Sequence, residues 1–299
     1  MRDTVPVSEG YVPFHGYRTW YRVLGDLARP APGTLPLLML HGGPGMSHDC
    51  LEPLEALART GRPVVLYDQL GCGNSAVPDD PPRWTIPLFV GELAAVRAAL
   101  GLDRLHLLGF SWGGQLALAY ALTQPPGLAS LILHGTRANA RTREADTARV
   151  YATLPAGVGA ILHAHEAAGT TADPTYQAAQ RVFALRHVCR IDPWPPFLQR
   201  TITRMNPRVG EQVRALPGPE GNRDWDVTDR LGAIRVPTLI TAGRHDGLVP
   251  DQHDLLHAGI AGSELAVFEE SSHYAHAEEP ERYLATLATF LGRVEASSR

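Results

Sequence analysis

Gly109-Phe110-Ser111-Trp112-Gly113-Gly114 is the stretch that decides the fold, because it places a serine between glycines in the pattern G-x-S-x-G. The apolar run 104–109 predicts a strand before the serine, and the apolar spacing of 113–123 predicts a helix after it. A sharp strand-to-helix turn leaves no room for side chains two positions either side of the serine. Such a turn exposes the Ser111 hydroxyl at the positive end of the next helix. We therefore predict that Ser111 is a nucleophile.

Other apolar runs resemble the one before Ser111. They span 35–40, 63–67, 128–134, 236–242 and 264–268. Short continuous apolar runs are typical of strands buried on both faces of a parallel sheet. Helical patterns such as 88–100, which ends at Gly101, separate them. The alternation predicts an α/β fold with a mostly parallel sheet flanked by helices. Residues 11–24 alternate in character and predict a hairpin that turns near His15-Gly16.

The alternation of strands and helices stops after about residue 136. Residues 137–225 contain helical stretches such as 176–190 and proline-rich joints, but no strand-like run. We interpret 1–136 and 226–299 as the two parts of one α/β core. We interpret 137–225 as a helical cap that is inserted into this core.

A glycine-rich loop, His41-Gly42-Gly43-Pro44-Gly45, follows the apolar run 35–40. Acyl transfer places negative charge on a carbonyl oxygen, so two aimed N–H groups are needed to stabilise it. One comes from the residue after the nucleophile, here Trp112, and the other from a loop after an earlier strand. We predict that the backbone N–H groups of Gly43 and Trp112 form this oxyanion hole. For His41 we expect a structural hydrogen bond, not a role as base.

The acid and the base of a triad follow the nucleophile in the order Ser, Asp or Glu, His, each on a loop after a strand. Asp246 follows the run 236–242, and His273 follows the run 264–268. The histidine accepts the serine proton, and the carboxylate fixes the tautomer of the histidine. We predict Asp246 and His273 as these residues. The rivals are Asp251, Asp254, His245 and His276, of which His276 is the strongest.

Composition excludes several other chemistries. None of the 27 basic residues is a lysine, so neither a Schiff-base lysine nor a P-loop lysine is possible. The three cysteines provide neither a disulfide framework nor a thiolate zinc site. With a net charge of −4 and no basic stripe, nucleic acid is not expected as a partner. The chain shows no apolar leader and no membrane-length run, so we expect a cytoplasmic protein that needs no membrane, cofactor or metal.

With these residues placed, the chain resembles the proline iminopeptidase family of α/β hydrolases over nearly its whole length. The resemblance depends on His41-Gly42-Gly43-Pro44-Gly45, on Asp68-Gln69-x-Gly71-Cys72-Gly73-x-Ser75, on Gly109-x-Ser111-Trp112-Gly113-Gly114 and on Asp226-Val227-Thr228. It implies the α/β-hydrolase fold and the release of an N-terminal amino acid, often proline, from a small peptide, amide or arylamide. It also implies that the cap covers the site and selects the substrate.

Two positions depart from the family pattern. Leu70 replaces the usual arginine of the second motif, and Gly247 replaces an acidic residue that in some of these peptidases holds the substrate ammonium. An aminopeptidase needs such an anionic group, because a buried unpaired ammonium costs several kcal/mol. The resemblance suggests Glu220, which roughly matches another amine-binding acid of the family's cap. Glu211 and Asp192 are weaker candidates.

Other functions stay open on the sequence alone. The same machinery acts on an ester, a lactone or a thioester, and the glycine at position 247 favours such an acyl substrate. A protein of another class, a non-catalytic binding protein on the same fold, is the third alternative, and the complete triad argues against it. Epoxide hydrolase or dehalogenase chemistry needs an aspartate where Ser111 stands. The pattern leaves the oligomeric state open.

Overall fold

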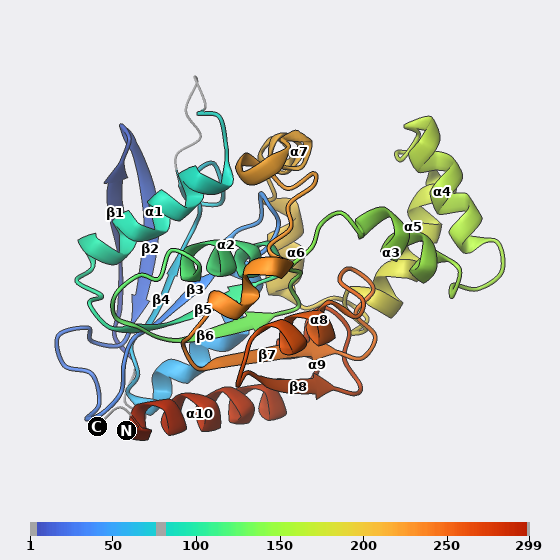
Figure 1. The fold of residues 1–299 in the computed structure, drawn as a ribbon. Helices are drawn as coiled ribbons and strands as arrows, with labels where there is room; N and C mark the ends of the chain where they lie inside the picture. Colours follow the sequence, from blue (N-terminus) through green and yellow to red (C-terminus); the bar gives the residue numbers. More distant parts are fainter. Residues whose placement is uncertain (1–4, 76–81, 298–299) are drawn as a thin grey trace.

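A single sheet of eight strands forms the centre of the molecule. The computed structural model describes residues 5–75 and 82–297. The strands lie in the order β1-β2-β4-β3-β5-β6-β7-β8 (Figure 1). They are β1 (Val7–Phe14), β2 (Tyr17–Leu24), β3 (Leu37–Leu40), β4 (Val64–Tyr67), β5 (Leu105–Phe110), β6 (Leu128–His134), β7 (Thr238–Gly243) and β8 (Glu264–Phe268). Strands β3 to β8 are parallel to one another, and β2 pairs antiparallel with β4, so the predicted α/β fold with a mostly parallel sheet is confirmed.

The first two strands form the predicted hairpin. β1 pairs antiparallel with β2, and Phe14 faces Tyr17 across the turn. The two turn residues, His15 and Gly16, have φ angles of 49° and 84°. Two successive positive φ angles match the right-handed twist of the strands, which is why the turn contains a glycine.

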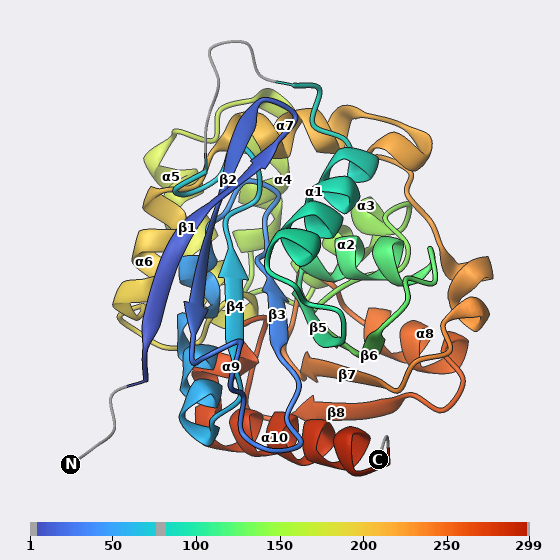
Figure 2. The same ribbon diagram turned by 90° about the vertical axis from the view of Figure 1, so that its left-hand side faces the viewer.

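Helices cover both faces of the sheet (Figure 2). One face carries α1 (Ile86–Ala99), α2 (Trp112–Ala121), η3 (Thr228–Ala233) and α8 (Gln252–Gly259). The other carries η1 (His48–Thr60), α9 (Ala275–Glu278) and α10 (Pro280–Ser297). Side chains of β3 alternate between the two apolar clusters, with Leu38 and Leu40 in one and Leu37 and Met39 in the other. This alternation explains why the central strands are apolar at every position.

The segment between β6 and β7 is helical. It contains α3 (Arg143–Tyr151), α4 (Val158–Ala168), α5 (Pro174–His187), α6 (Pro196–Thr203), α7 (Pro207–Ala215) and η2 (Gly218–Glu220). Three of these helices begin at a proline, whose missing N–H costs nothing in the first turn. Helices α3, α4 and α5 stand out to one side of the sheet (Figure 1). That 137–225 forms a distinct cap stays a prediction.

Several polar contacts bind the helical insertion to the core, and two groups of them lie at α6 and at the end of α5. On α6 and just after it, Arg200 and Arg204 pair with the buried Asp49 of η1, at 3.1 and 3.0 Å. At the end of α5, the carbonyl oxygens of His187 and Val188 accept the backbone N–H groups of Gly247 and Tyr274. The second contact joins the insertion to the loops after β7 and β8.

Candidate active site

Ser111 occupies a strained turn between β5 and α2. Its φ and ψ angles are 53° and −116°, a region that non-glycine residues rarely adopt. The surrounding backbone holds it there. Its N–H donates to the carbonyl oxygen of His134 at 2.8 Å, and Thr136 Oγ1 donates to its carbonyl oxygen at 2.6 Å. Strain of this kind persists where neighbours over-determine it, often at active sites.

Steric contacts explain the glycines around Ser111. A Cβ atom on Gly109 would overlap the carbonyl oxygen of Gly113. A Cβ atom on Gly113 would overlap the carbonyl oxygen of Leu40, at the end of β3. The turn therefore packs directly against the backbone on both sides, as the G-x-S-x-G spacing predicts.

Asp246 and His273 form a buried hydrogen-bonded pair. His273 Nδ1 lies 2.7 Å from Asp246 Oδ2, and both side chains are almost fully buried. The other carboxylate oxygen accepts the backbone N–H groups of Leu248 and Val249, at 2.8 and 3.2 Å. Because the carboxylate is fixed in this way, it accepts a hydrogen bond from the Nδ1–H of His273 and leaves Nε2 free to accept a proton.

The strand register brings this pair to Ser111. Phe110 pairs with His134 in the parallel β5–β6 ladder, so Ser111 and Gly135 follow neighbouring strand ends. A Cβ atom on Gly135 would lie 3.1 Å from His273 Nδ1. The ring centroids of Phe110 and His273 are 4.9 Å apart. The three residues predicted from the sequence therefore gather at the carboxyl ends of β5, β7 and β8.

The predicted oxyanion loop lies against Ser111. Gly43 has a φ angle of 125°, and a Cβ on its neighbour Gly42 would lie 3.4 Å from Ser111 Cβ. Trp112 is the first residue of α2, where a backbone N–H has no partner within the helix. The N–H of its indole ring donates to Gln69 Oε1 at 2.9 Å, which fixes the side chain.

His41 has the structural role that was expected. Its Nε2 accepts the backbone N–H of Gln69 at 2.9 Å, and its Nδ1 lies 2.9 Å from the carbonyl oxygen of Gly42. Burial lowers the pKa of His41, which favours the neutral ring that this pattern requires. The ring therefore joins the loops after β3 and β4.

The rival residues have other partners. Nε2 of His276 lies 2.8 Å from the carbonyl oxygen of Cys50, and Nδ1 lies 2.8 Å from Nε2 of His134. Burial lowers the pKa of His276 to about 4. Among the acids, Asp251 pairs with Arg149 at 2.5 Å. Asp254 and His245 are exposed. These positions favour Asp246 and His273 over their rivals.

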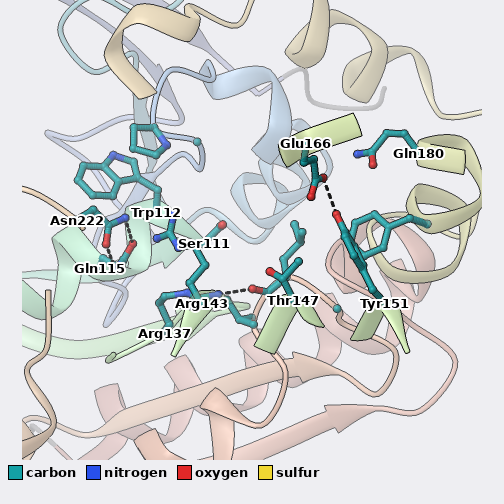
Figure 3. A pocket seen from close by; sticks show the side chains of 16 residues that line it. Ser111, Trp112, Gln115, Arg137, Arg143, Thr147, Tyr151, Glu166, Gln180 and Asn222 are labelled. Carbon is teal, nitrogen blue, oxygen red and sulfur yellow. Dashed lines mark hydrogen bonds between the residues drawn. The ribbon is translucent and has the colours of Figure 1, made fainter. Parts of the chain in front are cut away.

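A cavity of about 300 Å³ opens over Ser111 (Figure 3). Gly43 and Trp112 line it from the core, and Tyr151 and Glu166 line it from the helical insertion. The remaining lining residues are Pro44, Gln115, Arg137, Arg143, Thr147, Gln180, Phe183, Asn222, Gly247, Leu248 and Val249. The cavity therefore offers a substrate both the predicted nucleophile and a set of charged groups.

Position 247 has no room for an acidic side chain. Gly247 lines the cavity, but a Cβ there would lie 2.7 Å from the Cβ of His187. His187 is held in place because its Nδ1 lies 3.0 Å from the carbonyl oxygen of His245. A carboxylate that binds the substrate ammonium must therefore come from another position.

The predicted amine-binding acid Glu220 lies outside this cavity. It belongs to η2, is half exposed and pairs with Arg83 at 2.9 Å. Of the weaker candidates, Asp192 pairs with Arg181 at 2.8 Å, and Glu211 lies on α7. The acid in the cavity lining is Glu166 on α4, which was not among the predicted candidates. No motif or local spacing marks it.

Metal binding and membrane insertion are two further properties on which the structure bears. In residues 5–75 and 82–297, no group of three histidine, cysteine or acidic side chains is placed to bind a metal ion. No helix in the same residues is long and apolar enough to cross a membrane.

The fold and the site are those of an α/β hydrolase. Residues 36–280 match the model of a protein family whose description is "alpha/beta hydrolase fold". A proline iminopeptidase of Levilactobacillus brevis is 38% identical over 95% of this chain and 96% of its own. The crystal structure of proline iminopeptidase from Mycobacterium smegmatis is 39% identical, with a TM-score of 0.89 over 98% of this chain and 100% of that one. The crystal structure of VinJ is also 39% identical, with a TM-score of 0.89 over 96% of this chain and 99% of that one.

The chain belongs to the proline iminopeptidase family of α/β hydrolases. The resemblance predicted from the motifs is therefore confirmed, and the protein is a hydrolase. The predicted function, a serine hydrolase of the aminopeptidase type, agrees with the names of these relatives.

Proposed function

We propose that the protein releases an N-terminal amino acid from a small peptide or amide through an acyl-enzyme formed on Ser111. The single observation that supports this most is the buried Asp246–His273 pair beside the strained serine turn. A histidine oriented by a carboxylate is what activates a serine hydroxyl. That the reaction takes place in the cytoplasm stays a prediction.

The reaction has two halves. First, the Ser111 oxygen attacks the acyl carbonyl while His273 Nε2 takes the hydroxyl proton, and the backbone N–H groups of Gly43 and Trp112 stabilise the oxyanion. The C–N bond then breaks, and the leaving amine takes that proton from His273. In the second half, His273 accepts a proton from water, whose oxygen attacks the ester. The amino acid leaves, and the proton returns to Ser111.

Glu166 is the proposed partner of the substrate ammonium. Tyr151 and Tyr176 donate from their hydroxyl groups to its Oε1, at 2.7 and 3.2 Å. Among the described residues, Oε2 has no hydrogen-bond partner, and it is left to accept from a ligand. An ammonium desolvated in the cavity needs such an anion nearby.

The proposal is tested by comparing substrates that differ at the amine. The protein is assayed with proline and alanine arylamides, with their N-blocked forms and with simple acyl esters. We expect higher kcat/KM for the free-amine arylamides. Faster turnover of the N-blocked amides would contradict the proposal. A fluorophosphonate probe that labels S111A as well as wild type would contradict the role of Ser111.

Two carboxylate variants locate the ammonium site. In E166Q, we expect KM for free-amine substrates to rise roughly tenfold or more, since a charged hydrogen bond is lost, with little change for N-blocked ones. E220Q is the matched variant, because Glu220 pairs with Arg83 outside the cavity. If E220Q raises KM and E166Q does not, the assignment from the sequence is the better one.

A second candidate function uses the same triad on an ester, lactone or thioester. The filled space at Gly247 favours it, because His187 occupies the volume that an acidic side chain there would need. Higher kcat/KM for acyl esters than for every aminoacyl arylamide would support this alternative.

A further inference from the structure

The wall of the cavity beside Ser111 is cationic. Arg137, which follows β6, and Arg143, the first residue of α3, both line the cavity. In Figure 3 they lie on the same side as Ser111, and Glu166 lies across from them. Two guanidinium groups therefore face the space into which the substrate must enter.

Arg143 has no anionic partner. Among the described residues, no carboxylate lies within 4 Å of it, and no hydrogen bond fixes its guanidinium. Burial and the like charges of Arg137 and Arg214 lower its pKa to about 10. A half-buried cation surrounded by like charges is unfavourable in the free protein, so an anion is the ligand that this position fits.

Arg137 is nearly buried and incompletely bonded. Its Nη2 donates to the carbonyl oxygen of Leu248, but its Nη1 has no hydrogen-bond partner in the part of the chain that the structure describes. The nearest carboxylate, on Asp146, lies 3.9 Å from Nη1 and accepts hydrogen bonds from Thr142 and Arg149. Buried donors without a partner are rare in proteins, and a ligand commonly satisfies them.

A second cavity adjoins the cavity over Ser111. It has a volume of about 700 Å³, lies along α3 and α4, and shares Arg143, Thr147, Tyr151 and Glu166 with the cavity over Ser111. Arg143 therefore stands where the two cavities meet, within reach of a group on a substrate that extends beyond the scissile bond.

We propose that Arg143, together with Arg137, binds a carboxylate of the substrate and makes the enzyme prefer substrates whose leaving group carries one. This specificity rests on the proposed function of Ser111. A guanidinium matches a carboxylate through two parallel N–H···O bonds, so the site discriminates against the neutral amide of the same shape. The carboxylate is either the free C-terminus of a dipeptide or an acidic side chain after the scissile bond.

Two pairs of substrates separate these sources. Pro-Gly is compared with Pro-Gly amide, and Pro-Glu amide with Pro-Gln amide. In wild type we expect kcat/KM to be roughly ten- to hundredfold higher for the charged member of at least one pair, mainly through KM. In R143Q, we expect that ratio to fall close to one. Ratios within one variant do not depend on how much of it is folded.

Further variants make the test specific. R143K keeps the charge but loses the planar fork, so we expect an intermediate ratio. R141Q is the control, because Arg141 is exposed and lies 3.8 Å from Asp226. A wild-type ratio near one for both pairs, or a ratio that is unchanged in R143Q, would overturn the proposal.

A binding experiment keeps the test independent of the aminopeptidase reaction. Glutarate and its neutral diamide are titrated into the full chain by calorimetry, and their effect on fluorophosphonate labelling of Ser111 is measured. We expect glutarate alone to bind and to slow the labelling, with at least tenfold weaker binding in R143Q. Equal binding of both compounds, or binding that R143Q leaves unchanged, would overturn the anion site. Failure to cleave any aminoacyl substrate would instead contradict the proposed function alone.

Discussion

Arg62 and Glu295, 233 residues apart in the sequence, form a buried two-pronged ion pair. Their N···O distances are 2.6 and 2.9 Å, and both side chains are more than nine-tenths buried. Glu295 Oε1 also accepts the backbone N–H of Leu35 at 2.6 Å and lies 3.2 Å from His106 Nε2. The carboxylate thus joins the end of α10 to the segments that lead into β3 and β4 and to the start of β5.

Removing this carboxylate is expected to destabilise the fold. E295Q leaves the buried Arg62 guanidinium without an anion, which costs about 3–5 kcal/mol in the free energy of unfolding. Urea unfolding at pH 7 measures it. E264Q is the control, because Glu264 pairs with Arg293 at the surface and such pairs contribute about 0–1 kcal/mol.

The same variant has a characteristic pH dependence. Arg62 and His106 lower the pKa of Glu295 to about 2 against the opposing effect of burial. A carboxyl pKa that is lower in the folded state stabilises the fold above the unfolded value of 4.5 and loses this effect as pH falls toward 2. The difference in stability between wild type and E295Q should therefore shrink between pH 5 and 2. A constant difference would contradict the assignment.

Glu92 is expected to have the opposite pH dependence. Its buried carboxyl group accepts hydrogen bonds from the hydroxyl group of Thr19 and from the backbone N–H of Leu70. Burial nevertheless raises its pKa to about 8. A raised pKa stabilises the fold fully below pH 4.5, and this contribution is lost as pH rises through 8. Between pH 5 and 8, wild type should lose up to about 1.4 kcal/mol per pH unit relative to E92Q. Urea midpoints measure this, with the exposed E281Q as control. Parallel curves for wild type and E92Q would show the prediction to be wrong.

Replacing Asp246 by asparagine tests how the base is oriented. D246N removes the acceptor that fixes the Nδ1 proton of His273, so kcat should fall roughly 10⁴-fold with the fold intact. The double variant D246N/H273A should be little worse than H273A, because the pair acts as a unit. D254N, on the exposed side of α8, is the control. A tenfold or smaller loss in D246N would argue against this pair as the catalytic one.

The nucleophile turn should not tolerate a methyl group at Gly113. In G113A, the new Cβ meets the carbonyl oxygen of Leu40, so the turn must shift away from β3. We expect at least a hundredfold loss of kcat, since displacement of the nucleophile by about 1 Å has this effect. In G292A on α10, the new Cβ meets no atom of residues 5–75 or 82–297 within 4 Å, so this variant should stabilise the protein by about 0.5–1 kcal/mol. Near-normal activity of G113A, in a variant whose circular dichroism is native, would contradict the steric account.

Much of the fold could be predicted from the sequence because its signals are local. The apolar run 128–134 has the bounds of β6, and the His15-Gly16 turn lies where the alternation predicts it. Some predicted strands begin one or two residues earlier than the observed ones. The run 236–242, for example, starts at Val236, which precedes β7. There the structure begins the strand after Pro237, which lacks the N–H for a ladder bond.

The sequence by itself determined the serine turn and predicted which strand ends Asp246 and His273 follow, because the glycines and apolar runs that mark these positions are their neighbours in the chain. It did not determine what faces Ser111 from the helical insertion. Arg143 and Glu166 belong to separate helices, and no local spacing relates them to the serine. Glu220 matched a pattern but lies outside the cavity. Only the packing of the insertion over the strand ends decided which charges line the cavity, because such contacts join residues that are distant in sequence.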